Sequence, residues 1–501
     1  MTSATPPAAF AWTRRHVIAL AVLCLAALLD TIDVTVVNVA MPTIQTALHF
    51  SEGGLAWMVN AYMVPFGGFL LLAGRAGDLL GRRRVLLAGT ALFTAASLTS
   101  ALAPNETVMI ITRAAEGLGA AFVVPMTLAM LSSVFPAGPA RNRAFAVWGG
   151  VSAVAGTLGL IAGGLLVSAA GWRWIFFINI PVGAVVVAAA LRYLPADRPG
   201  RPGRSGRSGR RFDLLGASTA TGAASLLAYG VVQTQTHPWG SARTIALLAG
   251  AAILLAGFLA HGRFTARDPP MPLALWRNRS VAGSNLVSAL LSSAIFAMFY
   301  STTLYQQQVL GYSALRTGLA YIPLGLPILV SAGAGPAVVS RIGVRLTTAA
   351  GSLVAFGGMV LLAQLPVAGH LLTNLIGPEV IVGLGAGLVL IPTSVAAMSG
   401  VPAERGGIAS ALLNVSRQLG GALGLAVIST VVTPQAAHAL VADHAAAAAL
   451  TGGFRDGFAA SAGLMIATAI TALLFLREDG RGASVNLVEL RPRSVLGRRR
   501  P

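Results

Sequence analysis

The sequence GRAGDLLGRRRV occupies residues 74–85 and is rich in glycine and arginine. It separates two apolar stretches, 54–74 and 83–103. Each stretch is about 20 residues long, and a helix of that length crosses a hydrocarbon core of roughly 30 Å. Residues 74–85 are therefore predicted to form a tight polar connection between two membrane-spanning helices.

Apolar stretches of the same kind recur along the whole chain of 501 residues, which is 55% hydrophobic and only 10% charged. Fourteen stretches are predicted to span a membrane: 16–40, 54–74, 83–103, 107–133, 144–169, 173–194, 214–236, 242–262, 281–304, 317–339, 346–366, 373–399, 406–433 and 455–476. The sequence thus predicts an all-α integral membrane protein with 14 transmembrane helices.

The arginines follow this segmentation. Of the 35 basic residues, 29 lie at the two ends of the chain, in the even-numbered gaps between spans or in the span ends that border those gaps. Four lie in or at the edge of the opposite gaps, and Arg113 and Arg417 lie well inside spans. Since positive residues favour the cytoplasmic side, both termini are predicted to be cytoplasmic. Localisation in a bacterial cell membrane, as a multi-pass protein, is the expectation.

The composition also excludes several classes of protein. Every basic residue is arginine, and the lysine that a Walker A loop needs is absent, so no nucleotide is expected. The net charge of +19 fits cytoplasmic loops facing anionic lipid better than nucleic acid. Cys24 is the only cysteine, and the histidines show no metal-ligand spacing. No metal and no cofactor are expected.

Loop composition divides the chain into six regions. These are an N-terminal six-helix half (1–194), a cytoplasmic Arg/Gly/Pro linker (195–213), two extra transmembrane helices (214–262), a cytoplasmic connector (263–280), a C-terminal six-helix half (281–476) and a cytoplasmic disordered tail (477–501). Two six-helix halves around a central site are a recurrent transporter architecture.

The connection at residues 74–85 carries the first candidate functional group. Its glycines allow a tight turn and close helix approach, and Asp78 can cap a helix N-terminus and pair with an arginine. We expect a conformational latch, whose polar contacts form in one state and break in the other. The latch residues are Gly74, Gly77, Asp78, Gly81, Arg82 and Arg83. The alternative is an ordinary topology-setting connection.

The spacing Gly-x-x-x-Asp-x-x-Gly-Arg-Arg resembles the signature loop of the major facilitator superfamily. Five further strings resemble its fourteen-span drug:proton antiporter group, the EmrB/QacA-like proteins. They are DVTVVNVAMP (33–42), RAAEGLG (113–119), GWRWIFFINIPVG (171–183), QVLGYS (308–313) and NVSRQLGG (414–421). The resemblance covers nearly the whole chain. It implies the major facilitator fold, two six-helix bundles plus two extra spans, and proton-driven drug export.

Two positions depart from that group's pattern. Its antiporter motif in the fifth span has a proline where this chain has Leu160, although Gly159, Gly163 and Gly164 remain. The missing proline removes a kink, and the glycines still allow close helix packing. The arginine motif usually has a glutamine where this chain has Glu116.

Ionisable residues within spans are the candidates for proton coupling, because each costs roughly 2.5–3.5 kcal/mol at the bilayer centre. Asp30 and Asp33 are three residues apart and share a helix face, as do Arg113 and Glu116. Asp33 matches the family motif and ranks first, while Asp30 lies nearer mid-span. The alternatives are a structural hydrogen bond for Asp33 and an internal salt bridge for Arg113 and Glu116.

Polar and aromatic side chains within spans are candidates for a substrate cavity, since drug sites are mostly apolar with a few polar groups. They are Asn38, Asn60, Tyr62, Trp148, Asn285, Tyr300, Gln308, Glu379, Asn414 and Arg417. Any one of them alone could instead serve helix packing. Glu379 is expected near the outer interface.

These observations predict a proton-coupled exporter of hydrophobic, often cationic small molecules, rather than an enzyme. Its expected partners are those substrates, protons and membrane lipid, and it is expected to act as a monomer. Two alternatives stay open: a dedicated exporter of one metabolite, such as a self-made antibiotic, and a membrane receptor that does not transport.

Overall fold

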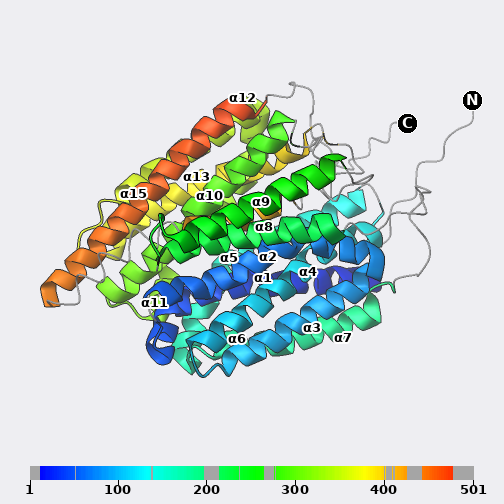
Figure 1. Cartoon of the computed structure of the whole chain (residues 1–501), viewed down its shortest axis with the longest axis horizontal. Helices are drawn as coiled ribbons and strands as arrows, with labels where there is room; N and C mark the ends of the chain where they lie inside the picture. The colour runs from blue at the N-terminus through cyan, green and yellow to red at the C-terminus, as the bar shows by residue number, and fades with distance from the viewer. Residues whose placement is uncertain are drawn as a thin grey trace, which may run out of the picture.

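The computed structural model describes residues 12–50, 52–136, 139–196, 214–235, 237–264, 276, 278–399, 401, 409, 412–425 and 443–477. Throughout these residues the regular structure is helical, and no strand is present among them (Figure 1). The all-α prediction is confirmed at this level. Most of the predicted linker and tail, 197–213 and 478–501, lies outside the described residues.

The helices follow one another with short connections. Their bounds are α1 Arg14–Leu48, α2 Glu52–Leu80, α3 Arg82–Ala101, α4 Glu106–Val134, α5 Pro139–Ala170, α6 Trp174–Phe177, α7 Asn179–Tyr193, α8 Leu214–Val232, η1 Gln233–Gln235, α9 Ala242–Phe264, α10 Arg279–Leu304, η3 Tyr305–Val309, α11 Ala314–Ala320, α12 Ile322–Leu362, η4 Leu371–Leu375, α13 Ile376–Met398 and α15 Asp443–Phe475. Residues 412–425 are also helical.

Several helix starts have the side-chain caps that their sequences provide. Thr13 accepts a hydrogen bond from the His16 backbone N–H before α1, and Asn105 accepts one from Val108 before α4. Within the described residues, nine helices are long and apolar enough to cross a membrane. Helices occupy part of every predicted span, but the count of fourteen stays a prediction.

The connection at residues 74–85 is shorter than the sequence indicates. α2 continues to Leu80, α3 begins at Arg82, and only Gly81 separates them, with a φ of 100° that favours glycine. Gly81 is therefore the N-cap of α3, and the expected capping role of Asp78 stays a prediction, because its side chain lies outside the described part of the chain. Asp78 lies in the last turn of α2.

The predicted spans 317–339 and 346–366 are also joined more tightly than expected. α12 runs from Ile322 to Leu362 with one non-helical residue, Gly343, at φ 83°. The polar connection expected between them is thus reduced to a kink at a glycine, because that residue alone provides the change of direction. The start of span 317–339 is instead divided, since α11 ends at Ala320 before α12.

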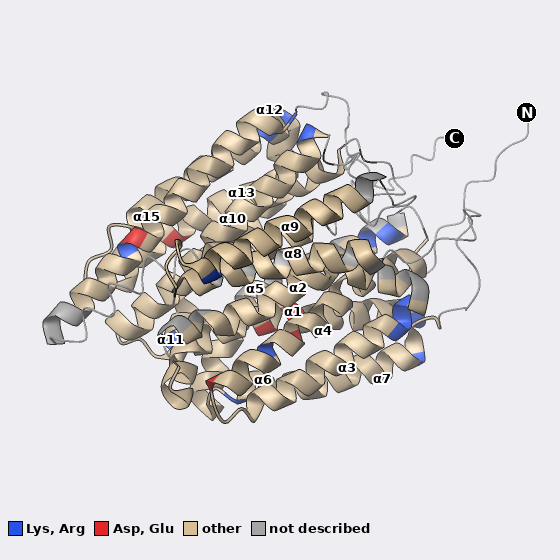
Figure 2. Cartoon of the chain, viewed as in Figure 1, with Lys and Arg blue, Asp and Glu red and all other residues tan. Residues whose placement is uncertain are grey.

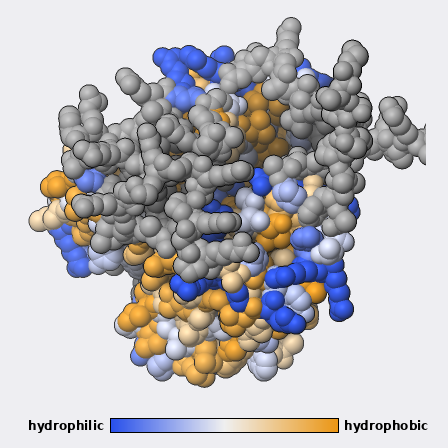
Figure 3. Space-filling model, turned by 90° about the vertical axis from the view of Figure 1, so that its right-hand side faces the viewer, coloured by the Kyte–Doolittle hydropathy of each residue, from blue (hydrophilic) through white to orange (hydrophobic). Residues whose placement is uncertain are grey.

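The bundle has two ends that differ in composition. We define the terminal end as the one where α1 begins and α15 finishes, and the distal end as the one containing the α1–α2 connection. Arginines gather at the terminal end, at the start of α3 and beside the α12 kink (Figure 2). Figure 3 looks onto that end and shows hydrophilic groups beside apolar surface.

Helices of the N-terminal region pack mainly on one another, as α1 on α5 and α3 on α4. Helices of the C-terminal region do likewise, as α12 on α13 and α10 on α15. α8 and α9 pair with each other, and α8 also packs on α2. α5 and α11 pack on each other and so join the two regions at the distal end. The six-region division itself stays a prediction.

Candidate functional site

A buried ionic cluster joins α1 and α4. Arg113 Nη1 lies 2.5 Å from Asp33 Oδ2 and also pairs with Glu116 Oε2. Asp33, Arg113 and Glu116 are 2%, 1% and 0% exposed. One guanidinium thus faces two carboxyl groups in an apolar interior, where an unpaired charge is strongly unfavourable.

Polar side chains from α3 and α7 complete the cluster. Asn179 Nδ2 donates to Asp33 Oδ1 at 3.0 Å and to Ser97 Oγ at 3.2 Å. Ser100 Oγ donates to Glu116 Oε1 at 2.9 Å. Asp33 therefore connects α1 with both α4 and α7. Asn179 was not among the predicted site residues, although it lies within the string GWRWIFFINIPVG at 171–183.

Asp30 lies in a different environment from Asp33. It is half-buried and accepts a 2.6 Å hydrogen bond from the Tyr62 hydroxyl on α2. The Tyr62 ring also lies below the Arg113 guanidinium, 4.5 Å from centroid to Cζ, at a distance typical of a cation–π contact. The structure thus brings the four predicted proton-coupling residues and Tyr62 together, with Asp30 on the more accessible side.

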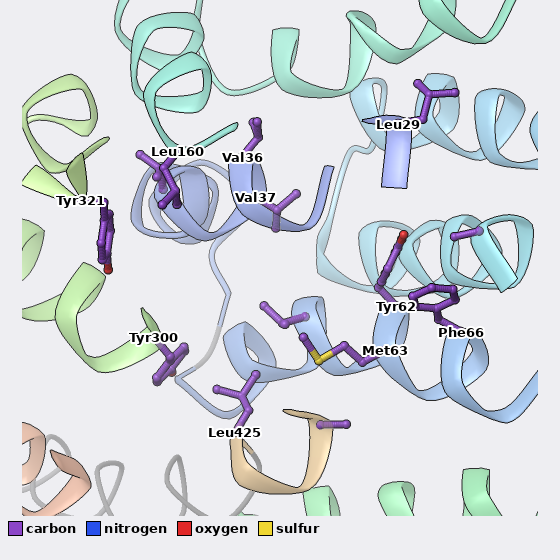
Figure 4. Packing of buried hydrophobic residues seen from close by; sticks show 14 of the residues in the cluster. Leu29, Val36, Val37, Tyr62, Met63, Phe66, Leu160, Tyr300, Tyr321 and Leu425 are labelled. Atoms are coloured by element: carbon purple, nitrogen blue, oxygen red, sulfur yellow. The ribbon is translucent and has the colours of Figure 1, made fainter. Parts of the chain in front are cut away.

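The glycines of the predicted antiporter motif lie at helix contacts. A Cβ added at Gly163 would lie 3.0 Å from Val36 Cα on α1, and one at Gly164 would lie 2.9 Å from Leu315 Cα on α11. Gly159 faces Thr35 in the same way. Close approach of backbones explains why these positions lack side chains. Figure 4 shows Val36 and Leu160 in this region of the packed interior.

Three amide side chains predicted to line a cavity take part in hydrogen bonds within the helix bundle. Asn38 Nδ2 donates to Val34 O on its own helix. Asn285 Nδ2 donates to Val281 O, and its Oδ1 accepts from Ser416 Oγ. Gln308 Nε2 donates to Gln45 Oε1 at the distal end. None of these hydrogen bonds involves Asp30, and the substrate role of the three residues stays a prediction.

The other predicted cavity residues are placed as follows. Asn60 is fully buried and neither side-chain amide atom has a hydrogen-bond partner among the described residues. Arg417 Nη2 donates to Ser394 Oγ at 2.9 Å. Tyr300 is buried, whereas Trp148 and Asn414 are half-buried. Glu379 is fully buried in the first turn of α13, and its expected place near the outer interface stays a prediction.

The latch residues have partners on neighbouring helices. Arg82 Nη1 donates to Ala129 O on α4 at 3.1 Å, and Arg83 donates to Leu191 O on α7. Gly77 is buried against Met126, and Gly74 has open space around its Cα. The arginines therefore hold the α2–α3 connection against α4 and α7 in this conformation.

Comparison with known proteins identifies the relatives of this chain. Residues 23–425 match the model of the Major Facilitator Superfamily. The cephamycin export protein CmcT of Amycolatopsis lactamdurans is 36% identical, over 82% of this chain and 84% of that protein. The puromycin resistance protein pur8 of Streptomyces alboniger is 35% identical, over 95% of each. The multidrug resistance protein Stp of Mycobacterium tuberculosis is 34% identical, over 80% and 73%.

Solved structures agree on the fold. The POT family transporter PepTSo superimposes with a TM-score of 0.66 at 16% identity, over 93% of this chain and 98% of that chain. A bacterial homologue of the human lysosomal transporter Spinster gives a TM-score of 0.64 at 15% identity, over 93% and 98%. With its apolar helices and these relatives, the chain belongs to the major facilitator superfamily and is a multi-pass membrane protein.

Proposed function

We propose that this protein exports hydrophobic, often cationic small molecules in exchange for protons, by alternating access. Relatives that match most of the chain are named for cephamycin export, puromycin resistance and multidrug resistance, which supports export of small molecules. The fold supports a mechanism in which two helical halves move around a central site.

The Asp33–Arg113–Glu116 cluster is the observation that carries proton coupling. Its two carboxyl groups exceed its single guanidinium by one, so one proton more or less changes the buried charge. A proton on Asp33 would weaken its contacts with Arg113 and Asn179, which hold α1 to α4 and α7. Arg113 would keep Glu116 as its counter-ion. Protonation would thereby favour a different arrangement of these three helices.

Asp30 and Tyr62 provide the recognition of cationic substrates in this proposal. A half-buried carboxylate beside an aromatic ring attracts lipophilic cations, and Asp30 is the more accessible acid of the cluster. Asp33 remains the coupling group and Glu116 sets charge selectivity. A bound cation and a bound proton would then each reduce the negative charge of the same buried cluster. Binding of one would therefore weaken binding of the other.

The proposal includes the membrane topology. We assign fourteen spans, a six-two-six division and a bacterial cell-membrane location, with both termini cytoplasmic and the distal end outside. The gathering of arginines at the terminal end supports this orientation. Residues 74–83 would then act as a cytoplasmic latch, since Arg82 and Arg83 contact α4 and α7 only while those helices stay in place.

A second candidate is a dedicated exporter of one metabolite. One relative is named for the export of a single antibiotic class, cephamycin, whereas another is named for multidrug resistance, so the dedicated exporter ranks second. A panel of chemically unrelated compounds separates the two candidates: several substrates indicate multidrug export, and one indicates a dedicated exporter. A receptor would bind such a compound without moving it.

Transport into inverted membrane vesicles tests the proposal. We expect accumulation of a lipophilic cation such as ethidium when the vesicle interior is acidified, and its loss when a protonophore collapses the gradient. Equal uptake with and without the gradient would contradict proton coupling. Absence of uptake for every compound of the panel would contradict export.

A further inference from the structure

Glu379 is an ionisable residue that the cluster around Arg113 does not use. It lies in the first turn of α13, at the distal end of that helix, and is 0% exposed. Neither carboxyl oxygen has a hydrogen-bond partner among the described residues. A carboxylate in such a position is strongly unfavourable, whereas the protonated acid is far better tolerated.

Other polar side chains that are buried at the distal end of the C-terminal region are uncharged. α13 packs on the start of α12, where a Cβ added at Gly383 would contact Leu324 O and lie 3.1 Å from Pro327 Cβ. Glu379 and Tyr321 each lie about one helical turn before this contact on their own helices. The Tyr321 hydroxyl donates to Phe299 O at 2.9 Å and lies 2.7 Å from Thr303 Oγ1, so its proton is already used. Gln306 and Thr317, also at the distal end, are fully buried with unpartnered side-chain atoms. A proton on Glu379 is the simplest neutralising group available there.

Titratable groups on the elements packed against α13 do not supply a counter-charge. Arg417, on the helical segment 412–425, donates to Ser394 in the second half of α13 and forms no ion pair within the described chain. α12 carries Arg341 and Arg345 beside its kink at Gly343, toward the terminal end. α10 carries Arg279 at its terminal start and Tyr300 as its titratable groups, and η4 carries none. Within the described chain, Glu379 takes part in no ion pair.

Tyr321 also links Glu379 to the contact between α5 and α11. Tyr321 N–H donates to Gly318 O at the end of α11. Gly318 packs against the Leu160 carbonyl of α5, and Leu315 N–H on α11 donates to Ser168 Oγ on α5 at 3.2 Å. Figure 4 shows Tyr321 and Leu160 on facing elements. Separation of α5 from α11 would change the surroundings of Tyr321 and therefore of Glu379.

We infer that Glu379 is a second proton-binding site, in the C-terminal half, which holds a proton while α5 and α11 are in contact and releases it when the distal end opens. This inference rests on the proposed proton-coupled function and deepens it. The proton is exchanged with water at the distal end, which the proposed topology places outside. Glu379 therefore responds to the opening of that end and carries no proton across the membrane; net inward proton movement stays with Asp33.

Infrared spectroscopy of purified protein in lipid nanodiscs tests this site without any substrate. A cysteine pair at Ser168 and Leu315, in a Cys24→Ser background, would hold α5 against α11 when oxidised. We expect a protonated-carboxyl band that is absent in Glu379→Gln. On alkalinisation the band should persist in the oxidised protein and disappear in the reduced protein.

Two control variants test whether the band belongs to Glu379. Asp456→Asn removes an exposed carboxylate on α15 and should leave the band unchanged. If Glu379→Gln does not fold, Glu379→Asp should shift the same band. Absence of the band in wild-type protein, or the same alkaline behaviour in oxidised and reduced protein, would overturn the inference. Failure of pH-driven ethidium uptake would overturn the proposed function instead, because the spectrum does not depend on transport.

Discussion

In the N-terminal half, Arg113 lies between two carboxyl groups, and Asn179 and Ser100 donate to those same groups. In the C-terminal half, Glu379 and Arg417 lie on different helices, and neither forms an ion pair within the described chain. A paired cluster can keep its charges in an apolar interior, whereas an isolated acid is stable there chiefly when neutral. The comparison assigns charge exchange to the first half and proton storage to the second.

Removing the guanidinium should have the largest effect. Arg113→Met leaves two buried carboxyl groups without a counter-ion, and breaking a buried pair costs about 3–5 kcal/mol. We expect a marked loss of thermal stability in nanodiscs and no transport. The triple variant Arg113→Met/Asp33→Asn/Glu116→Gln should recover stability without recovering pH-driven efflux. Unchanged stability in the single variant would show that the cluster is not held by charge pairing.

Disturbing the contact between α5 and α11 should have the second-largest effect. Gly164→Ala places a Cβ 2.9 Å from Leu315 Cα, and overpacking of this kind costs about 1–3 kcal/mol. We expect reduced disulfide formation between cysteines at Ser168 and Leu315, together with slower efflux. Gly156→Ala on the same helix is the matched control, because a Cβ at Gly156 has no heavy atom within 4 Å. Equal losses in both variants would indicate a general effect on α5.

Neutral replacements of Glu116 and Glu379 should change stability by smaller amounts, and by different amounts from each other. Glu116→Gln weakens a charge-assisted hydrogen bond with Arg113, and such bonds contribute about 1.5–3 kcal/mol. Glu379→Gln replaces a neutral acid by a neutral amide of similar shape, so stability should change by less than about 0.5 kcal/mol. Thermal unfolding of both variants in nanodiscs checks this order, and a reversed order would break the distinction between the halves.

Transport by the Glu116 variant adds a functional check. Glu116→Gln restores the residue usual in the resembling antiporter group, so coupling to the pH gradient should survive. Cationic substrates should be weakened more than neutral ones, since one negative charge near Tyr62 is lost. Uptake of ethidium and of an uncharged compound in the same vesicles measures the difference. If Glu116→Gln no longer responds to the pH gradient, Glu116 rather than Asp33 is the residue that couples transport to protons.

The helical membrane fold could be predicted from sequence because span length and arginine position are local properties of the chain. The pairing of Arg113 with Glu116 followed from helical spacing, but its contact with Asp33 needed the packing of α1 on α4. Asn179 was missed because its partners, Asp33 and Ser97, lie on other helices, and no sequence periodicity shows such contacts. Gly81 and Gly343 each replaced a predicted loop, since a single positive φ is enough to redirect a helix.

Proton-coupled transport by Asp33→Asn tests the central claim most directly. Asparagine keeps the shape of the side chain and removes its titration, so inverted vesicles should bind ethidium but no longer accumulate it when their interior is acidified. Asp456→Asn, at an exposed position, should accumulate ethidium like wild-type protein. If Asp33→Asn still concentrates ethidium with a rate that depends on the pH gradient, the coupling group lies elsewhere, with Asp30 next in order, and the role assigned to Asp33 is wrong.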